Sequence, residues 1–155
     1  MENGILSYSI GTPAPADLQS IETLFATFVS YTSLTYANIH YNTSGVKAAQ
    51  FDRLYSEQES FSLSRQRSSA TSYSYEGISY IYVDNDVTVT ADGTTTTQGG
   101  GTIKTNNLNL QLKAGWNAIY FKASVTMTSS TTGTGIQSLT VGDLPSINWV
   151  VENDG

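Results

Sequence analysis

The chain has no cysteine and few charged residues, and both absences narrow what the protein can be. Without cysteine, it can form no disulfide, no thiolate metal site and no cysteine nucleophile. Charged residues make up 13% of the 155 residues, about half the usual share. The formal net charge is −6, which leaves no basic footprint for phosphates. We therefore exclude nucleic acid as a partner and do not expect an anionic membrane surface.

Long apolar runs and a second histidine are also missing. No run approaches the roughly 20 apolar residues of a membrane-spanning helix, so we expect no transmembrane segment. His40 is the single histidine, so it cannot build a multi-histidine metal site and would act alone as a base. Asp84 and Asp86 carry oxygen ligands that suit calcium, but a polar break between strands explains them more simply. We predict no metal, no cofactor and no catalytic residue.

The clearest pattern that is present is a period of two between residues 107 and 128. Leu108, Leu110 and Leu112 alternate with polar residues. After a break at residues 113–115, apolar residues alternate again from Ile119 to Met127. Alternate side chains of a strand point to the same face, so the segment predicts two half-buried strands joined by a short turn.

Further strand signals follow along the chain. Both faces of residues 78–83 carry bulky side chains, which predicts a central strand that is covered on both sides. Asp92-Gly93 predicts a hairpin turn, because both residues tolerate positive φ. We expect other strands near residues 6–10 and 147–151. The pattern predicts one domain over residues 1–155, an all-β and mostly antiparallel sandwich of the immunoglobulin-like or transthyretin-like kind.

A helical period appears only near residues 17–27. Apolar residues recur there at spacings of three and four, and Asp17 could cap the first turn. The alternative is a loop followed by a strand, because several β-branched residues lie in the same stretch. We therefore keep both a short helix and a loop with a strand open for this segment.

Aromatic residues are the candidates for ligand binding, and the chain has ten tyrosines. Tyrosine supplies rigid apolar area and a hydroxyl, so an exposed row of rings can hold a sugar or a peptide. The candidates are Tyr73, Tyr75, Tyr80, Tyr82 and Trp116. Tyr80 and Tyr82 share a face with Ile78, which favours burial of these two rings. Trp116 is explained more simply by packing at a turn.

Three segments occur in an order that is typical of one protein family. They read YIYVDNDVTVTADG at 80–93, LNLQLKAGWNAIYF at 108–121 and LPSINWVVEN at 144–153. In these segments the chain resembles uncharacterised β-sandwich domains of envelope lipoproteins from gut-type bacteria, well over its C-terminal half and loosely over the rest. The resemblance implies secretion and a lipid anchor on a cysteine at the mature N-terminus, which would lie upstream of Met1. It implies no catalytic residues.

Low charge, a hydroxyl-rich composition and the resemblance together predict a non-catalytic secreted or cell-surface domain. Its role would be adhesion, assembly or ligand capture, and its partner a glycan or a surface protein. We expect it to be extracellular or in the cell envelope, after removal of a signal or lipobox segment. Three alternatives stay open: a carbohydrate-binding module, a pilin-like subunit that donates or accepts a strand, and a hydrolase.

Overall fold

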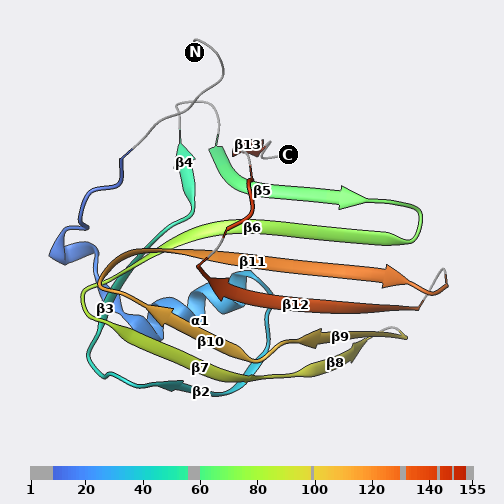
Figure 1. Ribbon diagram of the computed structural model, residues 1–155, viewed down its shortest axis with the longest axis horizontal. Helices are drawn as coiled ribbons and strands as arrows, with labels where there is room; N and C mark the ends of the chain where they lie inside the picture. Colours follow the sequence, from blue (N-terminus) through green and yellow to red (C-terminus); the bar gives the residue numbers. More distant parts are fainter. Residues whose placement is uncertain are drawn as a thin grey trace, which may run out of the picture.

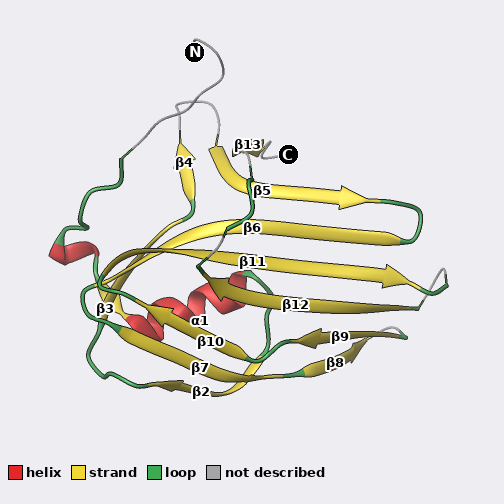
Figure 2. Ribbon diagram, in the orientation of Figure 1, coloured by secondary structure: helices red, strands yellow, loops and turns green. Residues whose placement is uncertain are grey.

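The described residues form a β-sandwich with one α-helix. The sandwich is as the sequence predicts, and the helix is one of the two structures left open for residues 17–27. The computed structural model describes residues 9–55, 60–98, 100–129, 132–142, 144–147 and 149–152. A large and a small sheet pack on each other, and helix α1 (Ile21–Tyr31) lies with them around one core (Figures 1 and 2).

The described residues form thirteen strands, of which ten belong to the large sheet. These ten are β1 (Gln19–Ser20), β3 (Lys47–Phe51), β4 (Arg53–Tyr55), β5 (Ser60–Ser68), β6 (Ser72–Val83), β8 (Thr95–Gln98), β9 (Gly101–Thr105), β11 (Gly115–Met127), β12 (Gly133–Val141) and β13 (Trp149–Glu152). The small sheet consists of β2 (Tyr36–Tyr41), β7 (Val87–Gly93) and β10 (Leu108–Leu112).

The order in the large sheet is β1-β3-β6-β11-β12-β9-β8, and β5 also pairs with β6 and carries β4 and β13. Strand β6 is therefore central, as its bulky sequence predicts: β3 and β5 share one of its edges and β11 occupies the other. The order in the small sheet is β10-β7-β2. The strands pair antiparallel, except that β9 runs parallel to β12.

The two strands of the 107–128 segment lie in different sheets. Strand β10 pairs with β7 in the small sheet, whereas β11 pairs with β6 and β12 in the large sheet. Both turn their apolar faces to the same core, because Leu110 and Ile119 are fully buried. The prediction of two half-buried strands is confirmed, and the short turn between them crosses from one sheet to the other.

The prediction of a hairpin turn at Asp92-Gly93 is wrong. The chain passes from β7 almost directly into β8, and the turn comes later, between the paired residues Gln98 and Gly101. A Cβ at Gly93 would lie 2.0 Å from the backbone oxygen of Thr105. Glycine is needed here because two backbones touch where this long hairpin leaves the small sheet and joins the large one.

Helix α1 begins later than the predicted range of 17–27 and ends later too. Ser20, not Asp17, is the N-cap, and its Oγ accepts a hydrogen bond from the Thr23 amide at 3.2 Å. Asp17 instead ends a short 3-10 turn, Pro15–Asp17. The reason is the apolar stripe, which starts at Ile21 and continues to Phe28, so the buried face of the helix spans these residues.

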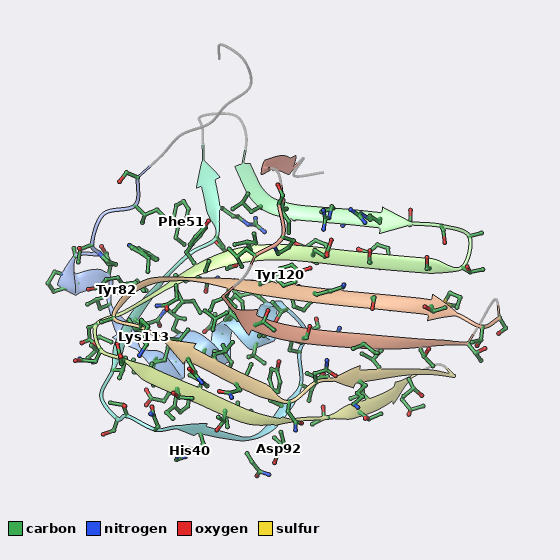
Figure 3. The ribbon with its side chains drawn as sticks, in the orientation of Figure 1. His40, Phe51, Tyr82, Asp92, Lys113 and Tyr120 are labelled. Carbon is green, nitrogen blue, oxygen red and sulfur yellow. The ribbon has the colours of Figure 1, made fainter. Side chains whose placement is uncertain are left out.

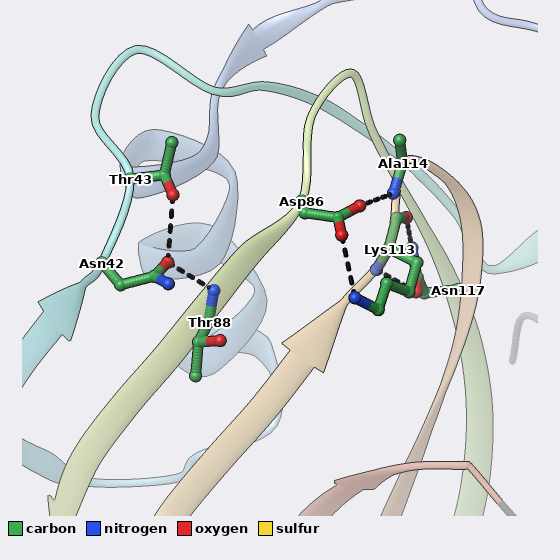
Figure 4. Close-up of polar contacts among 7 residues, drawn as sticks. All are labelled: Asn42, Thr43, Asp86, Thr88, Lys113, Ala114 and Asn117. Carbon is green, nitrogen blue, oxygen red and sulfur yellow. Dashed lines mark hydrogen bonds and ion pairs between the residues drawn. The ribbon is translucent and has the colours of Figure 1, made fainter.

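Two turns between the sheets are fastened to each other at one end of the sandwich (Figure 4). Residues 84–86 lead from β6 to β7, and residues 113–114 lead from β10 to β11. The Asp86 carboxylate accepts hydrogen bonds from the Ala114 amide at 2.9 Å and from Lys113 Nζ at 2.8 Å. The bond from Lys113 is the main cause that lowers the pKa of Asp86. We call these two turns and Asn117, which binds the second turn, the crossing clamp.

Some predictions fall outside the described residues. The predicted strand near residues 6–10 has only Ser9 and Ile10 within the described part, and neither is in a strand. Residues 149–152 form β13, as predicted for this region, but their side chains are outside the description. Among the described residues, α1 is the one α-helix, and it is too short to cross a membrane.

Candidate functional site

The five candidate rings do not form one row, because they lie on opposite faces of the large sheet. Side chains alternate along β6, so Tyr73 and Tyr75 point to the inner face, toward the core side, and Tyr80 and Tyr82 point to the outer face. Trp116, on β11, pairs with Tyr82 on β6 and is also on the outer face. The candidates therefore belong to two separate surfaces.

The outer rings pack on each other. Tyr82 and Trp116 have centroids 5.6 Å apart at 67°, an edge-to-face contact, and Phe51 lies 6.3 Å from Tyr80. The Trp116 indole N–H donates to the Gly11 carbonyl at 2.9 Å, which holds the N-terminal segment against the sheet. These rings are half-buried, and Figure 3 shows Phe51 and Tyr82 at this end of the sheet. These contacts indicate that the rings form a packed cluster.

A buried charged network lies further along the same outer face. Glu76 is 7% exposed, and its carboxylate accepts hydrogen bonds from Arg65 Nε at 2.6 Å and from the Tyr120 hydroxyl. The Tyr120 bond is the main cause that lowers the pKa of Glu76, with Arg65 adding to it. Burial, and then Glu76, raises the pKa of Tyr120 to about 12. Sequence reasoning missed this network, although opposite charges on adjacent strands β5 and β6 are its signal.

We expect Glu76 to make stability depend on acid pH. Because its pKa in the folded state lies below the ordinary value of 4.5, its contribution is complete above that pH and is lost as the pH falls through the folded value. Urea unfolding from pH 7 to pH 3 should show a shallower acid loss for Glu76→Gln than for wild type. Glu22→Gln, at an exposed carboxylate of α1, should keep the wild-type slope; equal slopes for all three proteins would contradict the prediction.

The inner face of the large sheet carries an open cleft of about 720 Å³ beside the C-terminal end of α1. This volume lies within the range of roughly 300–1,000 Å³ that is usual for ligand sites. The helix supplies one wall, β3 and the start of β4 supply another, and β5, β6 and β11 form the floor. The lining residues are Phe28, Tyr31, Thr32, Gln50, Asp52, Arg53, Ser62, Leu63, Tyr75, Gly77, Ile78, Ser79 and Phe121.

The lining combines aromatic rings with polar groups, of which Asp52 and Arg53 are charged. Tyr31 is 85% exposed at the rim, and Tyr75 packs on Phe121 with centroids 5.8 Å apart. Gln50 and Asp52 lie two residues apart on the β3 side, and the Gln50 amide donates to the Asp52 carboxylate at 3.2 Å. The cleft thus offers flat apolar surface together with amide, carboxylate and hydroxyl groups.

Local structure explains how these side chains come together. Phe28, Tyr31 and Thr32 are spaced at three and four residues, so they share one face of the last helical turn. Of the five predicted rings, Tyr75 alone is in the lining. Tyr31 and Gln50 were missed; the signal for Tyr31 was the helical period, but only if the helix was followed beyond residue 27.

His40 lies elsewhere. It is exposed on β2 of the small sheet, at the lower edge of the view in Figure 3, and it is not in the cleft lining. Asp84 accepts a hydrogen bond from the Lys47 amide at 2.8 Å, so it and Asp86 fasten turns. Within the described ranges, no three acidic or histidine side chains come together in a way that could hold a metal ion.

Comparison with known proteins gives no match to a family model, a curated protein or a solved structure. The resemblance to envelope lipoprotein domains therefore stays a prediction that rests on three segments. Two of these segments, with the sequences DNDV and LKAGWN, meet in the crossing clamp. They stabilise the sandwich and lie outside the cleft lining.

Proposed function

We propose that the protein is a non-catalytic ligand-capture domain that binds a neutral saccharide in the cleft beside α1. One observation carries the proposal: the same open cleft is lined by the exposed ring of Tyr31, by Tyr75, and by the hydrogen-bonding pair of Gln50 and Asp52. Adhesion to a glycan and capture of a soluble sugar would both use such a site.

The chemistry of a sugar fits this lining on two counts. A sugar ring has flat C–H faces that pack on aromatic rings, which carry a large apolar surface and, in tyrosine, a polar edge. Its hydroxyls each donate and accept hydrogen bonds, so they match the amide of Gln50 and the carboxylate of Asp52. Because these two groups already bind each other, their side chains are partly ordered before a ligand arrives.

Capture is favoured over turnover by where the ionisable groups lie. Among the described lining residues Asp52 is the single carboxylate, whereas glycoside hydrolysis uses a pair, and the exposed His40 lies on the other sheet. The low charge and hydroxyl-rich composition support a secreted or cell-surface location, where a glycan or a glycosylated surface protein would be met.

The test is titration calorimetry with neutral oligosaccharides of glucose, mannose, galactose, xylose and N-acetylglucosamine. We expect at least one series to bind. Tyr31→Ala should weaken it about tenfold, which corresponds to about 1.4 kcal/mol of lost ring contact. Tyr31→Phe keeps the ring and should bind nearly as wild type. Because Tyr31 is exposed, neither change should disturb the core.

Ile136→Ala is the matched control. It removes a large exposed apolar side chain from β12 that is not in the cleft lining, so saccharide affinity should not change. The proposal fails if no neutral saccharide binds, or if binding is indifferent to Tyr31→Ala. If the wild type released hydrolysis products from the saccharide and Asp52→Asn abolished this release, the protein would instead be a hydrolase.

A further inference from the structure

The inner face of the large sheet continues beyond the cleft as an exposed, uncharged surface. Tyr73, Val125, Gly135 and Ile103 are direct neighbours across β6, β11, β12 and β9. Tyr73 is 43% exposed and Ile103 is 36% exposed. We call these four residues the inner row. It lies next to Tyr75, which is already part of the cleft lining.

The side chains of the inner row form a continuous surface, because those of Ile103 and Val125 cover Gly135. A Cβ at Gly135 would lie 3.3 Å from side-chain atoms of both Ile103 and Val125. The glycine therefore lets these two side chains close over the strand between them. Met127, two residues beyond Val125 on the same face of β11, is 37% exposed and extends the apolar surface toward the open end of the sheet.

The charged side chains of these rows lie on the outer face of the sheet. Arg65, Glu76 and Lys122 are neighbours across three strands, and alternation places them on the outer face. The inner face at the same level carries Gln66, Tyr75, Ala123 and Gln137 in register. An occupant of the inner face therefore meets aromatic, aliphatic and amide groups and no charged side chain in these rows, which fits an uncharged partner.

The length of this surface sets the size of the partner. Phe121, in the cleft floor, and Met127 are six residues apart on β11. At about 3.3 Å for each residue of a strand, they are separated by roughly 20 Å. A single sugar ring is much shorter than this, whereas an extended chain of several rings could lie along the whole distance.

We propose that the ligand is an extended neutral glycan chain. The cleft binds one part of the chain, and the inner row binds the part that continues along the sheet. This inference rests on the proposed function, because it takes the cleft as the first binding point. It adds that the protein recognises a chain of several sugar rings and gains affinity with chain length. A second copy of the protein is the other occupant that such an apolar face could take.

The experiment compares chain lengths. The same neutral oligosaccharide series, from disaccharide to octasaccharide, are titrated into wild type, Tyr73→Ala and Ile103→Ser. For wild type we expect about tenfold tighter binding of the octasaccharide than of the disaccharide. Both variants should lose most of that gain and keep the wild-type affinity for the disaccharide. Ile136→Ala, on the outer face of β12, should behave as wild type at every length.

The two proposals fail in different ways. If a disaccharide binds and depends on Tyr31, but length adds nothing, the glycan-chain inference is wrong and saccharide capture in the cleft stands. If no oligosaccharide binds in a Tyr31-dependent way, both are wrong. Light scattering that shows a dimer, which Tyr73→Ala dissociates, would assign the inner row to a second copy and overturn the inference.

Discussion

Gly93→Ala should destabilise the protein by at least about 3 kcal/mol, a large part of the roughly 5–15 kcal/mol that holds a domain of this size together. The added methyl would lie 2.0 Å from the Thr105 oxygen and 2.5 Å from the Asn106 carbonyl carbon. These are backbone atoms, so no side-chain rotation can relieve the clash. The hairpin would have to separate where it passes from the small sheet to the large one. Urea unfolding, with the midpoint and slope both fitted, measures the loss.

Gly77→Ala is the matched control, since it makes the same change in a strand of the same sandwich. The new methyl would meet the Tyr75 ring at 3.5 Å, an ordinary contact distance. Alanine is better than glycine inside a strand by roughly 0.5–1 kcal/mol, so this variant should equal or exceed the wild type in stability. Equal stability of the two variants would show that the strands at Gly93 are not in close contact.

The sandwich was predictable because its strand signal is local. Alternation along β6, β10 and β11 depends only on neighbours in the sequence and on one buried face. Which strand pairs with which is a long-range property. Nothing near Leu112 says that its strand pairs with β7, about twenty residues earlier, and not with the strand that follows directly.

The Asp92-Gly93 error has the same origin. The dipeptide is a strong signal for a tight turn, but the need for glycine came from Thr105, which lies on another strand. A local pattern cannot separate a glycine that turns the chain from one that admits a second backbone. The chain actually turns between the paired residues Gln98 and Gly101, which are three residues apart.

The candidate site was predictable only in part. Tyr75 was among the predicted rings because tyrosine is a usual binding residue, and alternation alone separates it from Tyr80 and Tyr82 on the other face. Tyr31 was not among the predicted rings, because it is the last residue of a helix that continues beyond the predicted end. The cleft itself depends on how α1 packs against β3, and this long-range packing has no local signature in the sequence.

Asn117→Ala should be the second severe change, costing about 3 kcal/mol. The Asn117 side chain is buried and accepts a hydrogen bond from the Lys113 amide at 2.9 Å. It also donates to the Lys113 carbonyl at 2.7 Å and to the Gly115 carbonyl at 3.0 Å. Alanine would leave these backbone groups of the crossing clamp without their partner (Figure 4). Asn109→Ala, at an exposed position of β10, should change stability by less than about 0.5 kcal/mol.

Asn117→Asp separates the hydrogen bonds from the volume of the side chain. Aspartate has the same shape, but its charged form turns an acceptor toward the three carbonyl oxygens that the amide now binds, those of Lys113, Gly115 and Ile81. We expect this variant to be at least as unstable as the alanine variant at pH 7. Because the fold disfavours the charged carboxylate, its folded pKa is raised, and stability should return as the pH falls toward the ordinary Asp value of about 3.9. An Asp variant that is as stable as wild type at pH 7 would show that the clamp does not need the amide.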